Sequence, residues 1–309
     1  VIAKMAHGLA DDFLTTFILA FDGPVLVAPA MNTVMYHQQV TQDNLARLKS
    51  YGYEIVSPAS GQLACGDIGE GKLADLETLL FHLEKSVTAQ TLAGFRLVVT
   101  AGPTVAPIDP VRFVTNHSSG KMGFSIAHEA ALRGAEVTLV AGRVQRPTPV
   151  GVSRVDVATT AEMLAAIEAL MPKSDGLIMA AAPADYTPAE YHEEKIKKAG
   201  DELVLAFRKN PDILKTLKPI LSDKIVVGFA AESHQLLENA ERKLKEKNLD
   251  FIVANNIAGK DTAFRSDYNA ATIIYKDGHQ EVIPRQLKTE LADKILDEIQ
   301  HIRCQKEER

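Results

Sequence analysis

Short apolar runs alternate with helix-type segments along most of this 309-residue chain, and no other feature constrains its fold as strongly. The run from Gly176 to Ala182 is apolar at almost every position rather than at every second one. A strand of this kind belongs to a parallel sheet that helices cover on both faces. The sequence therefore predicts an α/β fold with a doubly wound, mostly parallel, Rossmann-like sheet. Its other strands should be Arg96 to Thr100, Glu136 to Ala141, Val155 to Val157, Ile225 to Ala230 and Phe251 to Ala254.

The chain changes character near residue 90, which predicts two domains, residues 1–90 and residues 91–309. Between them, residues 87–94 lose apolar periodicity and turn small and polar, as in a linker. The second domain should close with a hairpin around Asp277-Gly278 and a helix from Leu287. The remaining predicted helices are Gly120 to Arg133, Ala3 to Ala20, Gln38 to Tyr51 and Leu73 to Ser86, and the first-domain strands are Pro24 to Ala28 and Tyr53 to Ser57.

Charge and cysteine content exclude several classes of protein. A net charge of -6 and a pI of about 5.9 argue against a broad nucleic-acid or membrane-surface partner, which would need a basic face. No apolar stretch approaches the ~20 residues that span a bilayer. Cys65 and Cys304 offer neither a disulfide framework nor metal-ligand spacing. We expect a cytoplasmic protein whose phosphate-binding sites are local.

The loop after the first strand of the second domain has the composition of an anion site. Thr100-Ala101-Gly102-Pro103-Thr104 comes at a strand end, where open α/β sheets bind ligands, and the loop runs into the next helix through Ser118-Ser119-Gly120. The N–H groups of a helix N-terminus attract phosphates and carboxylates. These residues could equally just cap the helix and let it pack on the sheet. The additional donors Arg112 and Asn116 favour a ligand site, because a turn does not need them.

A second strand end is also rich in small residues. Met179, Ala180 and Ala181 leave room for a base or ribose, and Asp185 could hold a hydroxyl group or Mg²⁺, although a solvated turn is the common alternative. Other segments of this domain each have a structural interpretation beside a functional one. In the structural interpretation, Lys195 belongs to a solvated basic patch, and Asn210 caps a helix that starts in Asn210-Pro211-Asp212-Ile213. In the same interpretation, Phe229 is a core residue, and Lys243 and Lys247 lie on a solvated helix face.

The motifs Thr100-Ala101-Gly102-Pro103-Thr104, Asp109-Pro110-Val111-Arg112 and Asn116-His117-Ser118-Ser119-Gly120-Lys121-Met122-Gly123 closely resemble the ligase half of the bacterial bifunctional phosphopantothenoylcysteine decarboxylase/phosphopantothenate–cysteine ligase family. The resemblance covers about residues 92–300. It implies a coenzyme A biosynthesis enzyme that converts CTP and 4'-phosphopantothenate into an acyl-cytidylate and pyrophosphate, after which cysteine displaces CMP. Asn116 is then similar to the residue that holds the acyl-cytidylate carbonyl, Arg112 to a substrate contact, and Lys195 to the lysine of acyl-cytidylate formation.

The same resemblance assigns the nucleotide site. Asp185 resembles a CTP contact and, by its own chemistry, is the candidate Mg²⁺ ligand, and Pro183 departs from the usual family sequence beside it. The residues alone do not distinguish CTP from ATP, and the bacterial domain arrangement favours CTP. The implied CTP contacts are Met179, Ala180, Ala181, Asp185, Lys195, Asn210, Pro211, Asp212, Ile213, Phe229, Lys243 and Lys247.

The first domain is similar to a partial, flavodoxin-like decarboxylase that uses FMN. Asn32 in Pro29-Ala30-Met31-Asn32 resembles the residue that binds the substrate carboxylate, and Cys65 resembles the acid that protonates the enethiolate. The family's Gly-rich flavin loop and histidine segment do not occur in this sequence, and His7 is no substitute. We therefore expect an N-terminally truncated domain whose decarboxylation is impaired. The family also implies a homodimer through the ligase domain, and a larger homo-oligomer where the decarboxylase domain is complete.

Two other functions stay open at this point. One is a nicotinamide- or flavin-dependent oxidoreductase on a Rossmann sheet, although no acidic residue follows a glycine fingerprint in the expected frame. The other is a non-catalytic regulatory subunit. Pyrophosphate release that depends on CTP and cysteine would distinguish the ligase from both.

Overall fold

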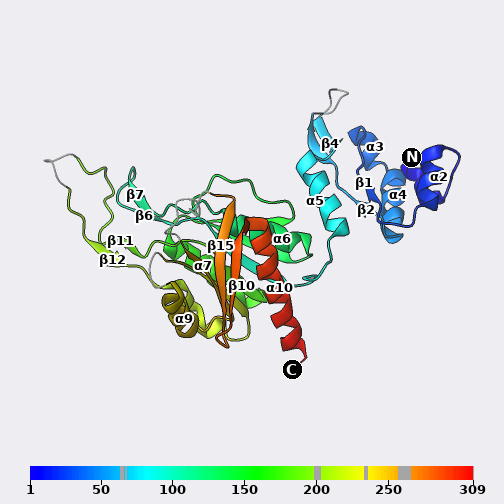
Figure 1. Cartoon of the computed structure of the whole chain (residues 1–309). Helices are drawn as coiled ribbons and strands as arrows, with labels where there is room; N and C mark the ends of the chain where they lie inside the picture. The colour runs from blue at the N-terminus through cyan, green and yellow to red at the C-terminus, as the bar shows by residue number, and fades with distance from the viewer. Residues whose placement is uncertain (63–65, 67, 198–202, 233–235, 257–265, 309) are drawn as a thin grey trace. The chain divides into compact units, whose positions relative to one another are not determined.

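The computed structural model describes all residues except 63–65, 67, 198–202, 233–235, 257–265 and 309 (Figure 1). It divides into two compact units, Val1–Ala89 and Gln90–Arg309. None of the helices within the described residues is both long and apolar enough to cross a membrane.

The second unit is built on an eight-stranded sheet with the order β16-β15-β14-β13-β10-β5-β8-β9. The strands from β14 to β9 in this order run parallel, while β15 and β16 form an antiparallel hairpin at one edge. The predicted doubly wound, mostly parallel sheet with a C-terminal hairpin is confirmed. The strands are β5 Arg96–Ala101, β8 Glu136–Ala141, β9 Val152–Asp156, β10 Gly176–Met179, β13 Ile225–Glu232, β14 Phe251–Asn256, β15 Tyr268–Tyr275 and β16 Gln280–Leu287.

The central strand β10 is shorter than its apolar sequence predicts. All four residues of β10 are buried, and Ile178 lies in register between Val99 of β5 and Val227 of β13. The strand was expected to continue to Ala182, but the ladder with β5 and β13 stops at Met179. Beyond Met179, Ala181 N donates instead to the Thr100 side chain of β5, and Ala182 N donates to the Gly102 carbonyl in the loop that follows β5.

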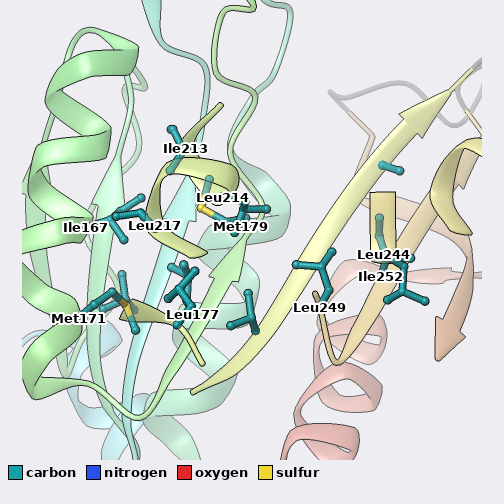
Figure 2. Close-up of a cluster of buried hydrophobic side chains, with 14 of the residues drawn as sticks. Ile167, Met171, Leu177, Met179, Ile213, Leu214, Leu217, Leu244, Leu249 and Ile252 are labelled. Carbon is teal, nitrogen blue, oxygen red and sulfur yellow. The ribbon is translucent and has the colours of Figure 1, made fainter. Parts of the chain in front are cut away.

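Helices cover both faces of this sheet. On one face, α6 packs against α10 and against β5 and β8. On the other face, α7, α8 and α9 contribute to a buried apolar cluster with the strands, for example through Ile167, Leu217 and Leu244 (Figure 2). Burying a large apolar side chain stabilises the fold by roughly 1.5–3 kcal/mol. The helices are α6 Lys121–Leu132, α7 Thr160–Leu170, α8 Ile213–Leu217, α9 Leu236–Lys247 and α10 Lys288–Glu307, with short 3-10 turns at Met171–Lys173 and Lys218–Ile220.

Two small hairpins project from the carboxyl end of the sheet and form what we call the arm (Figure 1). The first pairs β6 Val105–Pro107 with β7 Phe113–Thr115, and the second pairs β11 Tyr186–Pro188 with β12 Phe207–Lys209. They contact each other, and His192 N donates to the Ile108 carbonyl. The sequence predicted a long loop at the first hairpin and no strand at the second, because three-residue strands are too short to show periodicity.

The first unit combines short strands with helices. β1 pairs with β2 in parallel, and β3 pairs with β4 in an antiparallel hairpin that was not predicted. Its elements are α1 Ile2–His7, α2 Phe13–Ala20, β1 Leu26–Val27, α3 Thr33–His37, α4 Gln39–Ser50, β2 Glu54–Ile55, β3 Ala59–Gln62, β4 Ile68–Lys72 and α5 Leu76–Val87.

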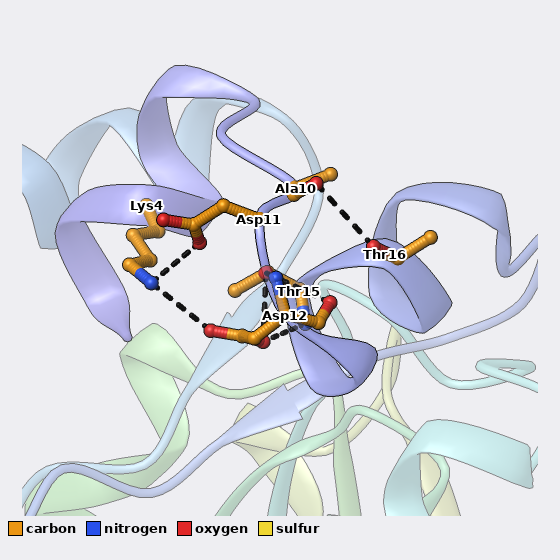
Figure 3. Close-up of polar contacts among 6 residues, drawn as sticks. All are labelled: Lys4, Ala10, Asp11, Asp12, Thr15 and Thr16. Carbon is orange, nitrogen blue, oxygen red and sulfur yellow. Dashed lines mark hydrogen bonds and ion pairs between the residues drawn. The ribbon is translucent and has the colours of Figure 1, made fainter.

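The helix predicted from Ala3 to Ala20 is in fact two helices. Gly8 ends α1 in the left-handed region with φ of 66°, a conformation that glycine adopts without strain. Asp12 then caps α2 by accepting a hydrogen bond from Thr15 N at 2.8 Å. Lys4 Nζ donates to Asp12 at 3.0 Å and also binds Asp11, which ties the two helices together (Figure 3).

Close packing of α6 on β5 generates a first prediction. A Cβ atom at Gly123 would lie 2.6 Å from Ala101 Cβ and 2.7 Å from the Thr100 carbonyl oxygen. Gly123→Ala should therefore lower the free energy of unfolding by about 1–3 kcal/mol, despite the better helix propensity of alanine. Urea denaturation measures the change. Ser125→Ala on the same helix is the control and should shift stability by less than about 0.5 kcal/mol. Equal stability of Gly123→Ala and the wild type would contradict this packing.

Candidate active site

The site lies where the strand order of the sheet reverses. From β5 the chain moves through β8 to β9 on one side, and it returns to β10 on the other side of β5. The carboxyl ends of β5 and β10 are therefore neighbours, and such a switch point is where open α/β sheets bind ligands. Pro103 and Ala182 form a β-bridge there, and Ala182 N donates to the Gly102 carbonyl at 2.9 Å. Gly102 has φ of 78°, which glycine tolerates best.

Buried threonine hydroxyl groups fix these two strand exits. Thr100 Oγ1 accepts a hydrogen bond from Ala181 N at 3.1 Å, and Thr104 Oγ1 accepts one from Ala184 N at 2.8 Å. Thr104 Oγ1 also lies 2.9 Å from Thr160 Oγ1, which donates to the Ala184 carbonyl at 3.2 Å. Sequence reasoning did not single out these threonines as functional. Their position in or beside strand-end motifs is the signal that could have identified Thr100 and Thr104.

A pocket of about 450 Å³ opens at the N-terminus of α6. Gly120 is the N-cap of this helix, with φ of 74°, and no side chain caps the helix. Ser118 Oγ accepts from Gly120 N at 3.4 Å and Ser119 Oγ accepts from Lys121 N at 3.5 Å. The alternative in which Ser118 acts as the helix cap is therefore wrong. The pocket is lined by residues 115–122 and 180–182 together with Phe229, Ala230, Asn255, Asn269 and Lys288.

Asn116 lies in the wall of this pocket. Its Nδ2 donates to the Ala182 carbonyl at 3.0 Å and to the Pro183 carbonyl at 3.2 Å. The side chain is exposed, and these bonds hold its amide beside the exit of β10. An amide donor is thereby placed next to the small residues Ala180 and Ala181, where a bound carbonyl could approach it.

A second pocket of about 160 Å³ adjoins the first, because Ala181 and Phe229 line both. Asn210 connects its two sides, since Asn210 Nδ2 donates to the Ala184 carbonyl at 2.8 Å and Asn210 N donates to the Asp185 carbonyl at 2.8 Å. Of the residues expected to contact a nucleotide, this pocket brings together Met179, Ala181, Asp185, Asn210, Pro211, Asp212, Ile213, Phe229 and Lys247, while Ala180 lines the larger pocket.

Asp212, and not Asn210, is the cap of helix α8. Asp212 accepts a hydrogen bond from Lys215 N at 3.2 Å, so the predicted helix start at Asn210 was too early. Asp212 also pairs with Lys247 Nζ at 3.0 Å. Burial raises the pKa of Asp212, but the hydrogen bond and charge of Lys247 outweigh this effect, so the pKa lies below its ordinary value. A cation on α9 is therefore fixed at the edge of the second pocket.

Arg112 and Lys195 lie on the arm and line neither pocket within the described residues. Arg112 Nε donates to Asp109 Oδ2 at 2.9 Å, and the neighbour of Lys195, Ile196, donates its N–H to the same oxygen at 3.2 Å. The Arg112 guanidinium holds the pKa of the Asp109 carboxyl well below its usual range. Lys195 is exposed, while Lys243 is half-buried on α9 outside both linings.

In the first unit, Asn32 caps α3 by accepting a hydrogen bond from Val34 N at 2.8 Å. The loop before it packs on the β3–β4 hairpin, since Met31 N donates to the Gly71 carbonyl at 2.9 Å. Gly71 is required there, because a Cβ would lie 2.3 Å from the Met31 carbonyl oxygen. The connection between β3 and β4 carries Cys65, which lies outside the described residues, whereas Cys304 is a free, exposed thiol.

Both units match known families. The family described as the C-terminal domain of the DNA/pantothenate metabolism flavoprotein matches residues 92–302, and the flavoprotein family matches residues 1–88. Together with the switch-point pockets, these matches define the class as a pantothenate-metabolism flavoprotein. A crystal structure of the C-terminal domain of the coenzyme A biosynthesis bifunctional protein CoaBC is similar, with a TM-score of 0.60, 39% identity, and coverage of 69% of this chain and 98% of that chain.

Full-length relatives narrow the class further. The bifunctional protein CoaBC of Vibrio cholerae is 44% identical over 96% of this chain and 75% of its own length. The CoaBC protein of Escherichia coli K12 is 45% identical over 97% of this chain and 75% of its own length. The chain belongs to the family of bifunctional coenzyme A biosynthesis proteins, which confirms the resemblance seen in the sequence motifs.

The hydroxyl group of Thr104 provides a test of how the site is held together. Thr104→Val preserves shape but leaves Ala184 N and the Thr160 hydroxyl without this partner. We expect the free energy of unfolding to fall by about 1–3 kcal/mol, the cost of an unsatisfied buried polar group. Thr104→Ser keeps the hydroxyl group and is the matched control in the same denaturation experiment. If Thr104→Val had the same free energy of unfolding as Thr104→Ser, the hydroxyl group would have no structural role.

Proposed function

We propose that residues 91–309 form a ligase that joins 4'-phosphopantothenate to cysteine at the expense of CTP. The observation that carries this proposal is the pair of adjoining pockets at the switch point, with Asn116 in the wall of the larger one. A carboxylate substrate in the larger pocket and a nucleotide in the smaller one would meet beside Ala181 and Phe229. Membership in the coenzyme A biosynthesis family supports the same assignment.

The first step forms an acyl-cytidylate. A carboxylate oxygen of 4'-phosphopantothenate attacks the α-phosphorus of CTP, and the bond to pyrophosphate breaks. Negative charge builds on the transferring and leaving phosphates, and cations stabilise it. Lys247 is already at the edge of the smaller pocket, while Lys195 would reach the phosphates from the arm and Lys243 from α9.

Asp185 fits a Mg²⁺ ion that the nucleotide brings with it. It is exposed and lines the smaller pocket, and no cluster of three or more metal-ligating side chains occurs within the described residues. Mg²⁺ commonly uses one or two carboxylates together with substrate phosphates, and Asp185 supplies one such carboxylate. The ion would neutralise phosphate charge when bound.

In the second step the cysteine amine attacks the acyl carbon, CMP leaves, and the amine loses a proton. Asn116 would donate to the developing oxyanion, exchanging a hydrogen bond to Ala182 or Pro183 for one to the intermediate. Arg112 would contact the substrate from the arm, in the same subunit or across a homodimer of ligase domains.

The first unit corresponds to the FMN-dependent decarboxylase half of the family. Its match to the flavoprotein family supports this origin. Asn32, fixed at the start of α3, would bind the carboxylate of phosphopantothenoylcysteine, and Cys65 would supply the proton. FMN, when bound, supplies the redox chemistry. A larger homo-oligomer through this half and a cytoplasmic location complete the proposal.

Two substitutions separate the two chemical steps. Lys195→Gln should reduce pyrophosphate release at least about 100-fold, because a charge that stabilises the first transition state is lost. Asn116→Asp should keep pyrophosphate release but block CMP release, so that acyl-cytidylate accumulates. Quenched reactions analysed by chromatography measure all three species. Lys245→Gln, an exposed lysine on α9, is the control. Normal turnover in both site variants would remove these assignments.

Substrate omission tests the function itself. Pyrophosphate release in a first turnover should require only CTP and 4'-phosphopantothenate, whereas CMP release and continued pyrophosphate release should additionally require cysteine. A panel of CTP, ATP, GTP and UTP should show the highest kcat/KM with CTP. Oxidation or reduction of a nicotinamide cofactor would instead support the oxidoreductase alternative, and a complete lack of turnover would support a non-catalytic subunit.

A further inference from the structure

Lys288 is a buried cation that neither step of the proposed ligation uses. It is the first residue of α10, only 8% exposed, and it lines the larger pocket. Its Nζ donates to the Ser266 carbonyl at 2.6 Å, the one hydrogen bond of this ammonium within the described residues. Because Lys288 Nζ has three N–H donors, two of them remain for another acceptor in this part of the chain. Removing a lysine ammonium from water is costly unless an opposite charge compensates it.

The charges around Lys288 do not compensate it. Lys121 of α6 and Arg146 of the β8–β9 loop repel it, and Asp267, which precedes β15, attracts it. Asp267 is itself paired with Lys121 at 2.6 Å and is largely exposed. Burial, together with Lys121 and Arg146, lowers the pKa of Lys288 to about 8 despite Asp267. The local balance is positive.

The lining of the pocket favours an anion as well. The described residues that line it include Lys121 and Lys288 but no aspartate or glutamate. The uncapped N-terminus of α6 adds N–H groups with partial positive charge. Asn255 and Asn269 complete this side of the pocket and bond to each other at 3.2 Å. A dianionic group would neutralise Lys288 and use its remaining donors.

We propose that Lys288 binds the phosphate monoester of 4'-phosphopantothenate and so anchors the substrate end remote from the reacting carboxylate. The inference rests on the proposed ligase function. The pocket is continuous from Asn116, where the carboxylate reacts, to Lys288, which matches a substrate with anionic groups at both ends. The CTP triphosphate is the competing occupant, and the kinetic constants for the two substrates distinguish them.

The test compares Lys288→Met, Lys288→Arg and wild type, with Lys294→Met, an exposed lysine of the same helix, as the control. Lys288→Met should raise the KM for 4'-phosphopantothenate about 10- to 100-fold, as expected for a lost charge-assisted hydrogen bond. The KM for CTP and kcat should change less than about threefold, and Lys288→Arg should recover most of the affinity. An unchanged KM for 4'-phosphopantothenate, or a rise confined to CTP, would overturn the inference.

The pH profile gives a second measurement that a structural role alone would not move. Because the folded pKa of Lys288 is depressed to about 8, wild-type kcat/KM for 4'-phosphopantothenate should fall as pH rises through 8. Lys288→Arg stays charged over this range. The ratio of the wild-type kcat/KM to the kcat/KM of Lys288→Arg should therefore fall as pH rises. Titration of the substrates affects both enzymes equally and cancels in that ratio. A pH-independent ratio would contradict the proposal, even if the methionine variant failed to fold. A wild type that releases neither pyrophosphate nor CMP would instead refute the ligase function.

Discussion

The hydrogen bonds that join the exits of β5 and β10 are the constraint on which the site depends. Gly102, Ala182 and Ala184 are linked through backbone groups and the hydroxyl of Thr104, all at distances of 2.8 to 2.9 Å. Because buried polar groups are costly to leave unpaired, the two exits cannot separate without losing several bonds together. Both pockets are built on this junction, and Ala181 at its edge contributes to the walls of both.

An acidic protein can bind anionic ligands because the electrostatic field in a pocket depends mainly on the charges nearest to it. The chain carries a net charge of -6, yet two lysines and no carboxylate occur among the described lining residues of the larger pocket. Low-dielectric walls strengthen such a field relative to one at an open surface. A buried, uncompensated lysine lowers stability in the empty protein. The same desolvation makes its interaction with a bound phosphate stronger than one made in water.

Sequence patterns predicted an element well where its apolar pattern alone decided its bounds and no tertiary hydrogen bond competed. The strand Glu136–Ala141 was predicted to the residue, because an apolar run lies between Gly134 and Gly142. The β10 strand was predicted too long, because Ala180 to Ala182 are apolar, although Ala181 and Ala182 bond to the Thr100 side chain and the Gly102 carbonyl outside the regular ladder. The arm was missed because tertiary contacts, not periodicity, create its strands. Motif resemblance selected the residues of the smaller pocket but did not select Thr160 or Lys288.

The arm couples two residues that sequence motifs treat as separate. Asp109 is buried, and its carboxylate accepts hydrogen bonds from Arg112 and from Ile196 N. Arg112 also donates to the Ile196 carbonyl at 3.1 Å. Both the N–H and the carbonyl of Ile196, the residue next to Lys195, are therefore hydrogen-bonded within the arm. Any movement of one hairpin relative to the pockets therefore carries Arg112 and Lys195 together. Under the proposed function, the contact that would orient the acid substrate and the charge that would act on the nucleotide form one unit organised by the Asp109 carboxylate.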